Sequence, residues 1–176
     1  RQDALLSAAR FILAVNEVIN SQAGSQVGGV GKVAVQPGAY NVVPGKVVLG
    51  MEIRDLSYEK VQELYKAIEK GAAAIAKSGN TTITFKSRPP DAMPALTDTV
   101  IQNKILQSAR ALGFSYKYMQ SGAGHDAQNM AKIAPIGMIF VPSVGGISHS
   151  PKEFTKAVDM ANGTNVLLQT ILQLDK

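Results

Sequence analysis

Hydrophobic residues at the start of the chain recur every three or four positions. This spacing is typical of an amphipathic helix; it runs from Asp3 to Asn20 and stops before Gly24. The residues that form the stripe are Leu5, Ala8, Ala9, Ile12, Val15 and Ile19. The pattern predicts a helix over 3–20 that starts without a clear N-cap.

The pattern changes to short apolar runs with turn signals between Val27 and Arg54. Residues 31–36 and 46–54 read as two strands, joined through Pro37-Gly38 and Pro44-Gly45. A second helix is predicted from a cap at Ser57 to Gly79, followed by a β-branched strand over 81–86. Residues 1–86 therefore predict an α-β-β-α-β order, one strand short of the common β-α-β-β-α-β unit.

The segment Arg88–Pro94 interrupts every periodic pattern and predicts a domain boundary, which separates residues 1–90 from 91–176. Beyond it, helices and strands alternate. The helices are predicted from a cap at Thr97 to Gly113, over about 126–134 and over 156–174, and the strands over 114–119 and 136–141. Such alternation favours an α/β layer structure, in which sites usually lie in loops beyond the strand ends.

Composition restricts the class of protein. The chain has 176 residues, a formal net charge of +5 and no cysteine, which excludes thiol nucleophiles, disulfides and cysteine zinc sites. If it is compact, it should expose about 8,000 Å² of the roughly 27,000 Å² of the unfolded chain, burying about 70%. No run of 18 apolar residues without Pro or Gly occurs, so no membrane span is expected.

Two ligand classes are disfavoured by details of the sequence. A phosphate-binding loop ending at Gly31-Lys32 would need Gly at position 26 and Ser or Thr at 33, where Gln26 and Val33 stand. A looser dinucleotide pattern at Gly29 precedes a strand instead of opening a helix. The strand over 46–54 has no aromatic residue on which RNA bases would stack, and the lysines are dispersed. We therefore expect no nucleotide or nucleic-acid partner.

The two histidines are the main candidates for chemistry. His125 follows Gly122-Ala-Gly at the start of a predicted helix, and His149 lies in the Gly- and Ser-rich loop 145–151. From the residues alone they could bind metal, stabilise an oxyanion or shuttle protons. They do not complete a metal site, which normally needs three or four ligands. A Ser-His-Asp triad drawn from Ser121, Ser148, His125 and Asp126 is the competing idea, although no Gly-x-Ser-x-Gly motif occurs.

Three groups of segments carry a resemblance to a known family. They are 36–44 through Arg54-Asp55, 121–127 with the sequence Ser-Gly-Ala-Gly-His-Asp-Ala, and 138–143 through Gly-Gly-Ile-Ser-His-Ser-Pro at 145–151. Taken together and in this order, they resemble the hydantoinase/carbamoylase branch of the metallopeptidase-like amidohydrolases. That branch includes N-carbamoyl-L-amino-acid hydrolases, β-ureidopropionases and allantoate or ureidoglycolate amidohydrolases.

The resemblance implies a fold and a set of partners. Residues 1–90 would form a two-layer α-β-β-α-β lid that lacks its first strand and through which the enzyme forms a homodimer. Residues 91–176 would be the C-terminal part of a three-layer α/β catalytic domain. The substrate would be a small ureido or N-carbamoyl carboxylate, and the expected location is the cytoplasm.

The resemblance also assigns roles to individual residues. His149 would be a metal ligand. Gly124 and His125 would contact the substrate, and His125 would act in catalysis by steadying the oxyanion. Asn41 and Arg54 would bind the substrate carboxylate, often across the dimer, which suits the two-pronged guanidinium. Without the resemblance, Arg54 reads as a strand-end charge paired with Asp55.

The implied cofactors are two divalent metal ions, Zn, Mn, Co or Ni, which polarise a bridging water. The other metal ligands and the general-base Glu of the family would lie upstream of Arg1. The sequence therefore predicts a C-terminal fragment of a longer amidohydrolase, inactive alone and with an exposed strand edge that needs a partner. The alternative is a non-catalytic fragment that serves in dimerisation or carboxylate binding.

Overall fold

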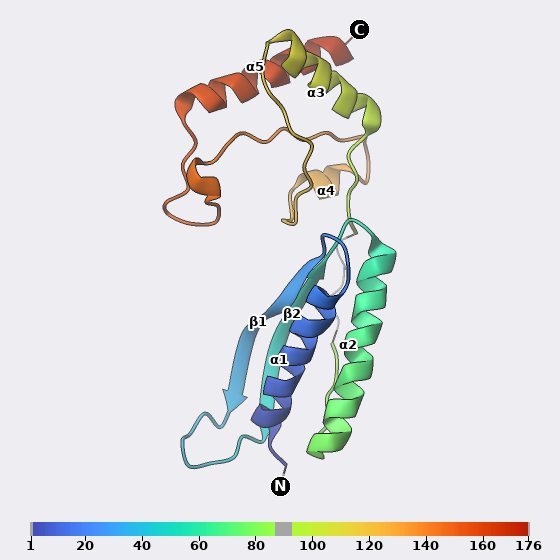
Figure 1. Ribbon diagram of the computed structural model, residues 1–176, viewed down its shortest axis with the longest axis vertical. Helices are drawn as coiled ribbons and strands as arrows, with labels where there is room; N and C mark the ends of the chain where they lie inside the picture. Colours follow the sequence, from blue (N-terminus) through green and yellow to red (C-terminus); the bar gives the residue numbers. More distant parts are fainter. Residues whose placement is uncertain (1, 87–92, 176) are drawn as a thin grey trace. The chain divides into compact units, whose positions relative to one another are not determined.

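The computed structural model describes residues 2–86 and 93–175. The chain divides into two compact units, Arg1–Pro94 and Ala95–Lys176, which are described separately below. Most of the predicted boundary segment Arg88–Pro94, residues 88–92, lies outside the described residues. Figure 1 shows helices α1 and α2 beside the strands β1 and β2 in the first unit, and helices joined by long extended segments in the second.

The two helices of the first unit lie where the hydrophobic spacing predicts them. Helix α1 spans Ala4–Ser21, and the side chain of Asp3 accepts hydrogen bonds from the amides at its start, Leu5 N and Leu6 N. The expectation that this helix lacks a clear cap is therefore wrong. Helix α2 spans Tyr58–Gly79 and is capped by Ser57, as predicted.

The two strands of the first unit form an antiparallel hairpin, which confirms the predicted pair. Strand β1 spans Val27–Gln36 and β2 spans Lys46–Arg54, with Val27 opposite Arg54 and Gln36 opposite Lys46. A bulge interrupts the register between Val30 and Lys32. Both helices pack against the face of β2 whose apolar side chains alternate along the strand, namely Leu49, Met51 and Ile53.

The core of the first unit comes from the two helices, and the sheet covers one side of it. Its buried side chains are Phe11, Val15 and Ile19 from α1 and Leu64, Ile68 and Ala72 from α2. Ile83 and Phe85 from the segment after α2 pack against this core, and the Phe85 ring lies 5.9 Å from that of Phe11. The core is thus closed by side chains from every element of the unit.

Residues 81–86 are extended but do not form the predicted strand. Their side chains alternate between half-buried and exposed, as a strand pattern requires, yet no ladder joins them to another segment of the described chain. Alternation depends only on side-chain burial, whereas a strand also needs a neighbour about 4.8 Å away. The prediction of a third strand here is wrong.

In the second unit, helices α3 and α5 pack against each other. Helix α3 spans Thr99–Ala111 and is capped by Asp98, one residue after the predicted cap Thr97. Helix α5 spans Ala157–Leu174, within one residue of the prediction. Where they meet, the buried hydroxyl oxygens of Ser108 and Thr170 lie 3.2 Å apart. A hydrogen bond replaces part of the apolar contact in this small core.

The remaining elements of the second unit are shorter than predicted. Helix α4 spans only Ala127–Met130, and a single 3₁₀ turn, η1, spans Val144–Gly146. Residues 114–119 and 136–141 are extended, but within 93–175 they join no sheet, so the two strands predicted there are wrong. The described fold is therefore mixed: helices with a two-stranded antiparallel sheet, which is compatible with the expected α/β class.

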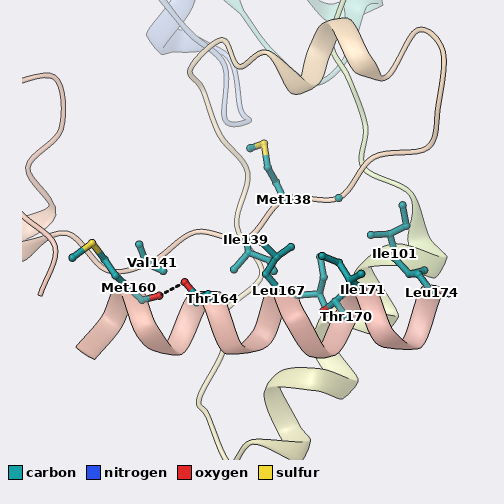
Figure 2. A pocket seen from close by; sticks show the side chains of 13 residues that line it. Ile101, Met138, Ile139, Val141, Met160, Thr164, Leu167, Thr170, Ile171 and Leu174 are labelled. Carbon is teal, nitrogen blue, oxygen red and sulfur yellow. Dashed lines mark hydrogen bonds between the residues drawn. The ribbon is translucent and has the colours of Figure 1, made fainter. Parts of the chain in front are cut away.

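An apolar pocket of about 650 Å³ opens between α3, α5 and residues 137–141. Figure 2 shows Ile139, Val141, Leu167 and Ile171 along it, and the Thr164 hydroxyl turned back to the Met160 carbonyl of its own helix, 2.9 Å away. The lining contains no charged side chain. This pocket is an open extension of the core, not a place where the predicted site residues gather.

The chain exposes more surface than the composition estimate anticipates. Its accessible surface is 12,633 Å², whereas even two separately compact domains of this total mass would expose about 10,000 Å². Exposed apolar side chains on several elements account for part of the difference, for example Leu13 on α1, Ile133 after α4 and Leu172 on α5. The expected burial of about 70% is not reached.

Helix α1 is the one helix of the described residues that is long and apolar enough to cross a membrane by length and composition. The sequence prediction of no membrane span rests on a different criterion, an unbroken run of 18 apolar residues. The mean hydropathy of α1 is high enough even though the helix contains the charged residues Arg10 and Glu17. Core helices of soluble proteins pass the same test, and α1 contributes Phe11, Val15 and Ile19 to the core of the first unit.

Replacing Gly163 with Ala should destabilise the second unit. A Cβ atom at position 163 would clash with Cγ1 of Val141, which packs against α5. Because a Val side chain has few other rotamers, the clash is not easily relieved, and we expect a loss of about 1–3 kcal/mol in the free energy of unfolding. Urea unfolding followed by circular dichroism measures it.

Gly71→Ala is the matched control for this prediction. Gly71 also lies inside a helix, but an added Cβ has open space around it. Because Ala is the better helix former, this change should stabilise the protein by about 0.5–1 kcal/mol. Equal effects of the two substitutions would mean that the contact between Gly163 and Val141 is not tightly packed.

Candidate functional site

The residues predicted to carry function divide between the two units. Asn41 and Arg54 lie in the first, and Gly124, His125 and His149 lie in the second. Each group is therefore described within its own unit.

Asn41 and Arg54 lie at opposite ends of β2. Asn41 is exposed in the loop 37–45, which is tied to the start of α1 by a hydrogen bond from Ala4 N to Pro44 O of 3.2 Å. Arg54 is the last residue of β2. The eight residue steps from Lys46 to Arg54 span about 26 Å. The loop that carries Asn41 therefore joins β2 at the end farthest from Arg54.

Arg54 forms a two-pronged ion pair with Glu52. Its Nε and Nη2 atoms donate to the two carboxylate oxygens at 2.8 and 2.7 Å. The hydrogen bond from Arg54 lowers the pKa of Glu52, against a small opposing effect of burial, and the pair raises the pKa of Arg54 in turn. Both side chains are exposed, at 44% for Arg54 and 65% for Glu52. A ligand carboxylate can therefore reach the Arg54 guanidinium and compete with Glu52 for it.

The expected pairing of Arg54 with Asp55 is wrong. Asp55 Oδ1 instead accepts from Ser57 N at 2.8 Å, in the turn that leads into α2. Neighbouring residues of a strand point to opposite faces, whereas residues two apart share a face. This period of two would have identified Glu52 as the partner from the sequence.

His125 is held from several sides in the loop that leads into α4. Its Nε2 lies 2.7 Å from Ser121 Oγ, and its backbone N–H donates to Gln128 Oε1 at 3.2 Å. The edge of the ring meets Phe140, with the ring centres 5.7 Å apart. Gly124 beside it is exposed, which leaves the backbone open to a ligand. Of these three partners, Ser121 is predicted from the sequence, whereas Gln128 and Phe140 are not.

His149 lies in an exposed loop with an unusual backbone conformation. Its φ angle is +54°, in the left-handed region that few residues other than glycine adopt. Its backbone N–H donates to Glu153 Oε2 at 3.0 Å, and Gly145 and Gly146 in the same loop also have positive φ. Such conformations need support from surrounding contacts and occur often at binding sites.

The described residues do not form a complete metal site or a catalytic triad. Within 2–86 and 93–175, no three His, Cys, Asp or Glu side chains lie close enough together to hold a metal ion. His149 therefore offers one ligand where three or four are normally needed. Ser121 and His125 do meet, but in the described chain no hydrogen bond joins Asp126 to His125, so the third member of a triad is not in place.

Comparison with known proteins gives one family match. Residues 4–173 match Peptidase family M20/M25/M40. The chain is 38% identical to an N-carbamoyl-L-amino acid amidohydrolase of Geobacillus stearothermophilus and 40% identical to a ureidoglycolate hydrolase of Arabidopsis thaliana, in each case over 99% of the chain. It is 33% identical to an allantoate amidohydrolase of Bacillus subtilis over 82% of the chain. The chain spans 42%, 37% and 35% of the lengths of these relatives.

Solved structures show the same likeness. AtUAH in complex with glyoxylate matches 99% of the chain at 38% identity and a TM-score of 0.89, over 41% of its own length. An amidase of the hydantoinase/carbamoylase family from Burkholderia multivorans matches 98% at 31% identity and a TM-score of 0.83, over 42% of its length. Bacillus subtilis YXEP, described as a dinuclear metal binding peptidase, matches 98% at 17% identity and a TM-score of 0.71, over 46% of its length, a likeness of fold alone.

Replacing Arg54 with Gln should raise the pKa of Glu52 toward the ordinary value of a glutamate. The guanidinium that favours the charged carboxylate is then gone, and a ¹³C NMR titration of the Glu52 carboxyl carbon measures the change. Since the pKa is lowered in the folded state, the pair stabilises the protein above the ordinary pKa. That contribution, at most about 1 kcal/mol for so exposed a pair, is lost as pH falls through the lowered pKa.

Arg10→Gln is the control for this titration. It removes an exposed guanidinium from α1 that forms no ion pair with Glu52 among the described residues, so the Glu52 pKa should stay where it is. An unchanged pKa in the Arg54→Gln variant would show that the ion pair does not persist in solution.

Proposed function

The chain belongs to Peptidase family M20/M25/M40, and from this premise we propose that the whole protein hydrolyses a linear C–N bond in a ureido or N-carbamoyl acid. The substrate class comprises N-carbamoyl amino acids and related acids such as allantoate and ureidoglycolate. The observation that carries the proposal is the identity of 38% and 40%, over 99% of the chain, to two enzymes named for such substrates.

The reaction adds water to the ureido or amide carbonyl and breaks its C–N bond. The carbamate that remains after the first C–N bond breaks loses carbon dioxide, so the products are ammonia, carbon dioxide and an acid with a free amino group. That acid is an amino acid from an N-carbamoyl amino acid, and an acid that keeps its second ureido group from allantoate. The alternative, a non-catalytic chain that serves only dimerisation or carboxylate binding, gains no support from relatives whose names are hydrolase names.

The residues of this chain have distinct proposed roles in that reaction. His125 steadies the negative charge that develops on the carbonyl oxygen, because its ring is already held by neighbouring side chains. Gly124 lets the substrate approach the backbone. Arg54 binds the substrate carboxylate with the same fork that holds Glu52, and Asn41 adds an amide contact.

The proposed cofactors are two divalent metal ions, Zn, Mn, Co or Ni, with His149 as one of their ligands. The described residues alone do not fit a metal pair, since they supply a single candidate ligand. We therefore derive no step of the reaction through the metals. The exposed position of His149 and its positive φ are compatible with a ligand that completes a site with residues elsewhere in the protein.

The positions of Asn41 and Arg54 favour a site shared by two protomers. Within one protomer the loop that carries Asn41 joins β2 at Lys46, and Arg54 lies at the other end of that strand, about 26 Å from Lys46. This arrangement favours a carboxylate that receives the two side chains from different copies. This agrees with the expected homodimer through residues 1–90. The homodimer and the cytoplasmic location stay predictions.

Ammonia release tests the proposed function directly. The whole protein should release ammonia from at least one of an N-carbamoyl-L-amino acid, allantoate and ureidoglycolate, and a chelator should abolish the release until divalent metal is returned. The 176-residue chain alone should release none, because it offers one candidate ligand. Elemental analysis should find about two divalent ions per active protomer. Turnover by metal-free protein would overturn the metal assignment, and no release from any of the three would overturn the function.

Complementation between two variants tests the shared site. Asn41→Ala and Arg54→Gln should each raise KM for the ureido acid by about tenfold or more, since each removes a contact to a charged group. A heterodimer of the two variants, isolated with two different tags, should regain about half of the wild-type activity, because one of its two symmetric sites is then intact.

The matched control is a doubly tagged dimer that carries Asn41→Ala in both protomers, which should stay as impaired as the untagged variant. If the mixed heterodimer shows no more activity than its parents, Asn41 and Arg54 do not serve one site from opposite protomers.

A further inference from the structure

The hydrogen-bond partners of Ser121 favour one direction for its contact with His125. Ser121 Oγ lies 2.7 Å from His125 Nε2 and 3.1 Å from the backbone nitrogen of Ala123. The Ala123 N–H can only donate, so Ser121 Oγ accepts that hydrogen bond. Both Ser121 and His125 are half-buried, so their polar atoms have restricted access to water.

The hydroxyl proton of Ser121 needs an acceptor of its own. Among the described residues, the acceptor within hydrogen-bond distance is His125 Nε2. A serine hydroxyl carries one proton and two lone pairs, so it can accept from Ala123 and donate to the imidazole at the same time. Such an arrangement requires Nε2 of the neutral ring to be unprotonated, with the ring proton on Nδ1.

Other contacts fix the plane of the same ring. The edge contact with Phe140, at an interplanar angle of 66°, restricts its tilt. The hydrogen bond from His125 N to Gln128 Oε1 and the one from Gln128 N to His125 O, of 2.9 Å, hold the backbone at this position. With the backbone and the tilt of the ring fixed, the hydrogen bond to the Ser121 hydroxyl sets which ring nitrogen faces Ser121.

We propose that Ser121 is a positioning residue for His125: it holds the neutral imidazole with its proton on Nδ1, so that Nδ1–H is the donor offered to a substrate carbonyl oxygen. The choice of substrate oxygen rests on the proposed function, whereas the position of the proton rests on the geometry alone. Ser121 acts through His125 and does not itself attack the substrate.

NMR of ¹⁵N-labelled histidine in the whole protein reads the ring proton directly, at a pH where the ring is neutral. The signals of His125 are those that disappear in His125→Gln. In the wild type, Nδ1 should have the chemical shift of a protonated nitrogen and Nε2 that of an unprotonated one. In Ser121→Ala the balance should move toward Nε2–H, the form that free histidine prefers.

Two further variants make this test specific. Ser121→Thr keeps the hydroxyl and should keep the proton on Nδ1, while Ser148→Ala, in the other histidine loop, should leave the His125 signals unchanged. If Ser121→Ala does not fold, the wild type and the Thr variant still decide. A wild-type ring protonated on Nε2, or signals indifferent to the loss of the Ser121 hydroxyl, would overturn the proposal.

Kinetics separates this proposal from the proposed function. If both hold, Ser121→Ala should lower kcat for the ureido acid by about tenfold to a hundredfold, with little change in KM, and Ser121→Thr should restore most of it. Nδ1 protonation in a protein that releases ammonia from no ureido acid would keep the positioning role and reject the proposed function. Unchanged kcat in Ser121→Ala would reject the role of Ser121 in the reaction.

Discussion

Helix packing is the constraint on which both units depend. Every fully buried side chain among the described residues lies on α1, α2, α3 or α5, and none lies on a strand or a loop. The hairpin and the extended segments are half-buried at most, because they pack against only one side of a helix pair. Burial of apolar surface is the main stabilising term in folding, so the rigid part of each unit is its helix pair. The proposed site residues all lie outside those pairs, in loops or at a strand end.

This division explains which parts of the fold the sequence predicts. Helices α1, α2, α3 and α5 are predicted within a few residues because period and caps are local signals. Asp3 is the exception, because the hydrophobic period includes it in the helix, while its role as the cap follows from its side-chain hydrogen bonds. The strands over 81–86, 114–119 and 136–141 were predicted from composition and alternation, yet pairing depends on a neighbour that no local pattern specifies. The prediction of the hairpin is confirmed because its two strands are neighbours along the chain.

The same reasoning applies to the candidate site. The two histidines stand out in the sequence because they are the only two in the chain and both lie in Gly-rich loops, whereas Glu52 and Phe140 matter only through their contacts with Arg54 and His125. Glu52 was within reach of the strand period, since it lies two residues before Arg54. Phe140 is not predictable in this way, because it lies 15 residues from His125 along the chain and meets it only in the folded structure. Family resemblance supplied roles for Asn41 and His149, which geometry alone leaves open.

The Glu52 ion pair determines how the proposed carboxylate site would work. An exposed ion pair contributes at most about 1 kcal/mol, so a substrate carboxylate that replaces Glu52 on Arg54 loses less than about tenfold in affinity. In return, the guanidinium stays aligned with its fork extended, which reduces the conformational entropy that a free arginine would lose on binding. Under the proposed function, Glu52 therefore acts as an internal stand-in for the substrate. A neutral ligand cannot take over both of its hydrogen bonds to the guanidinium as a carboxylate can, which favours acids over amides at this position.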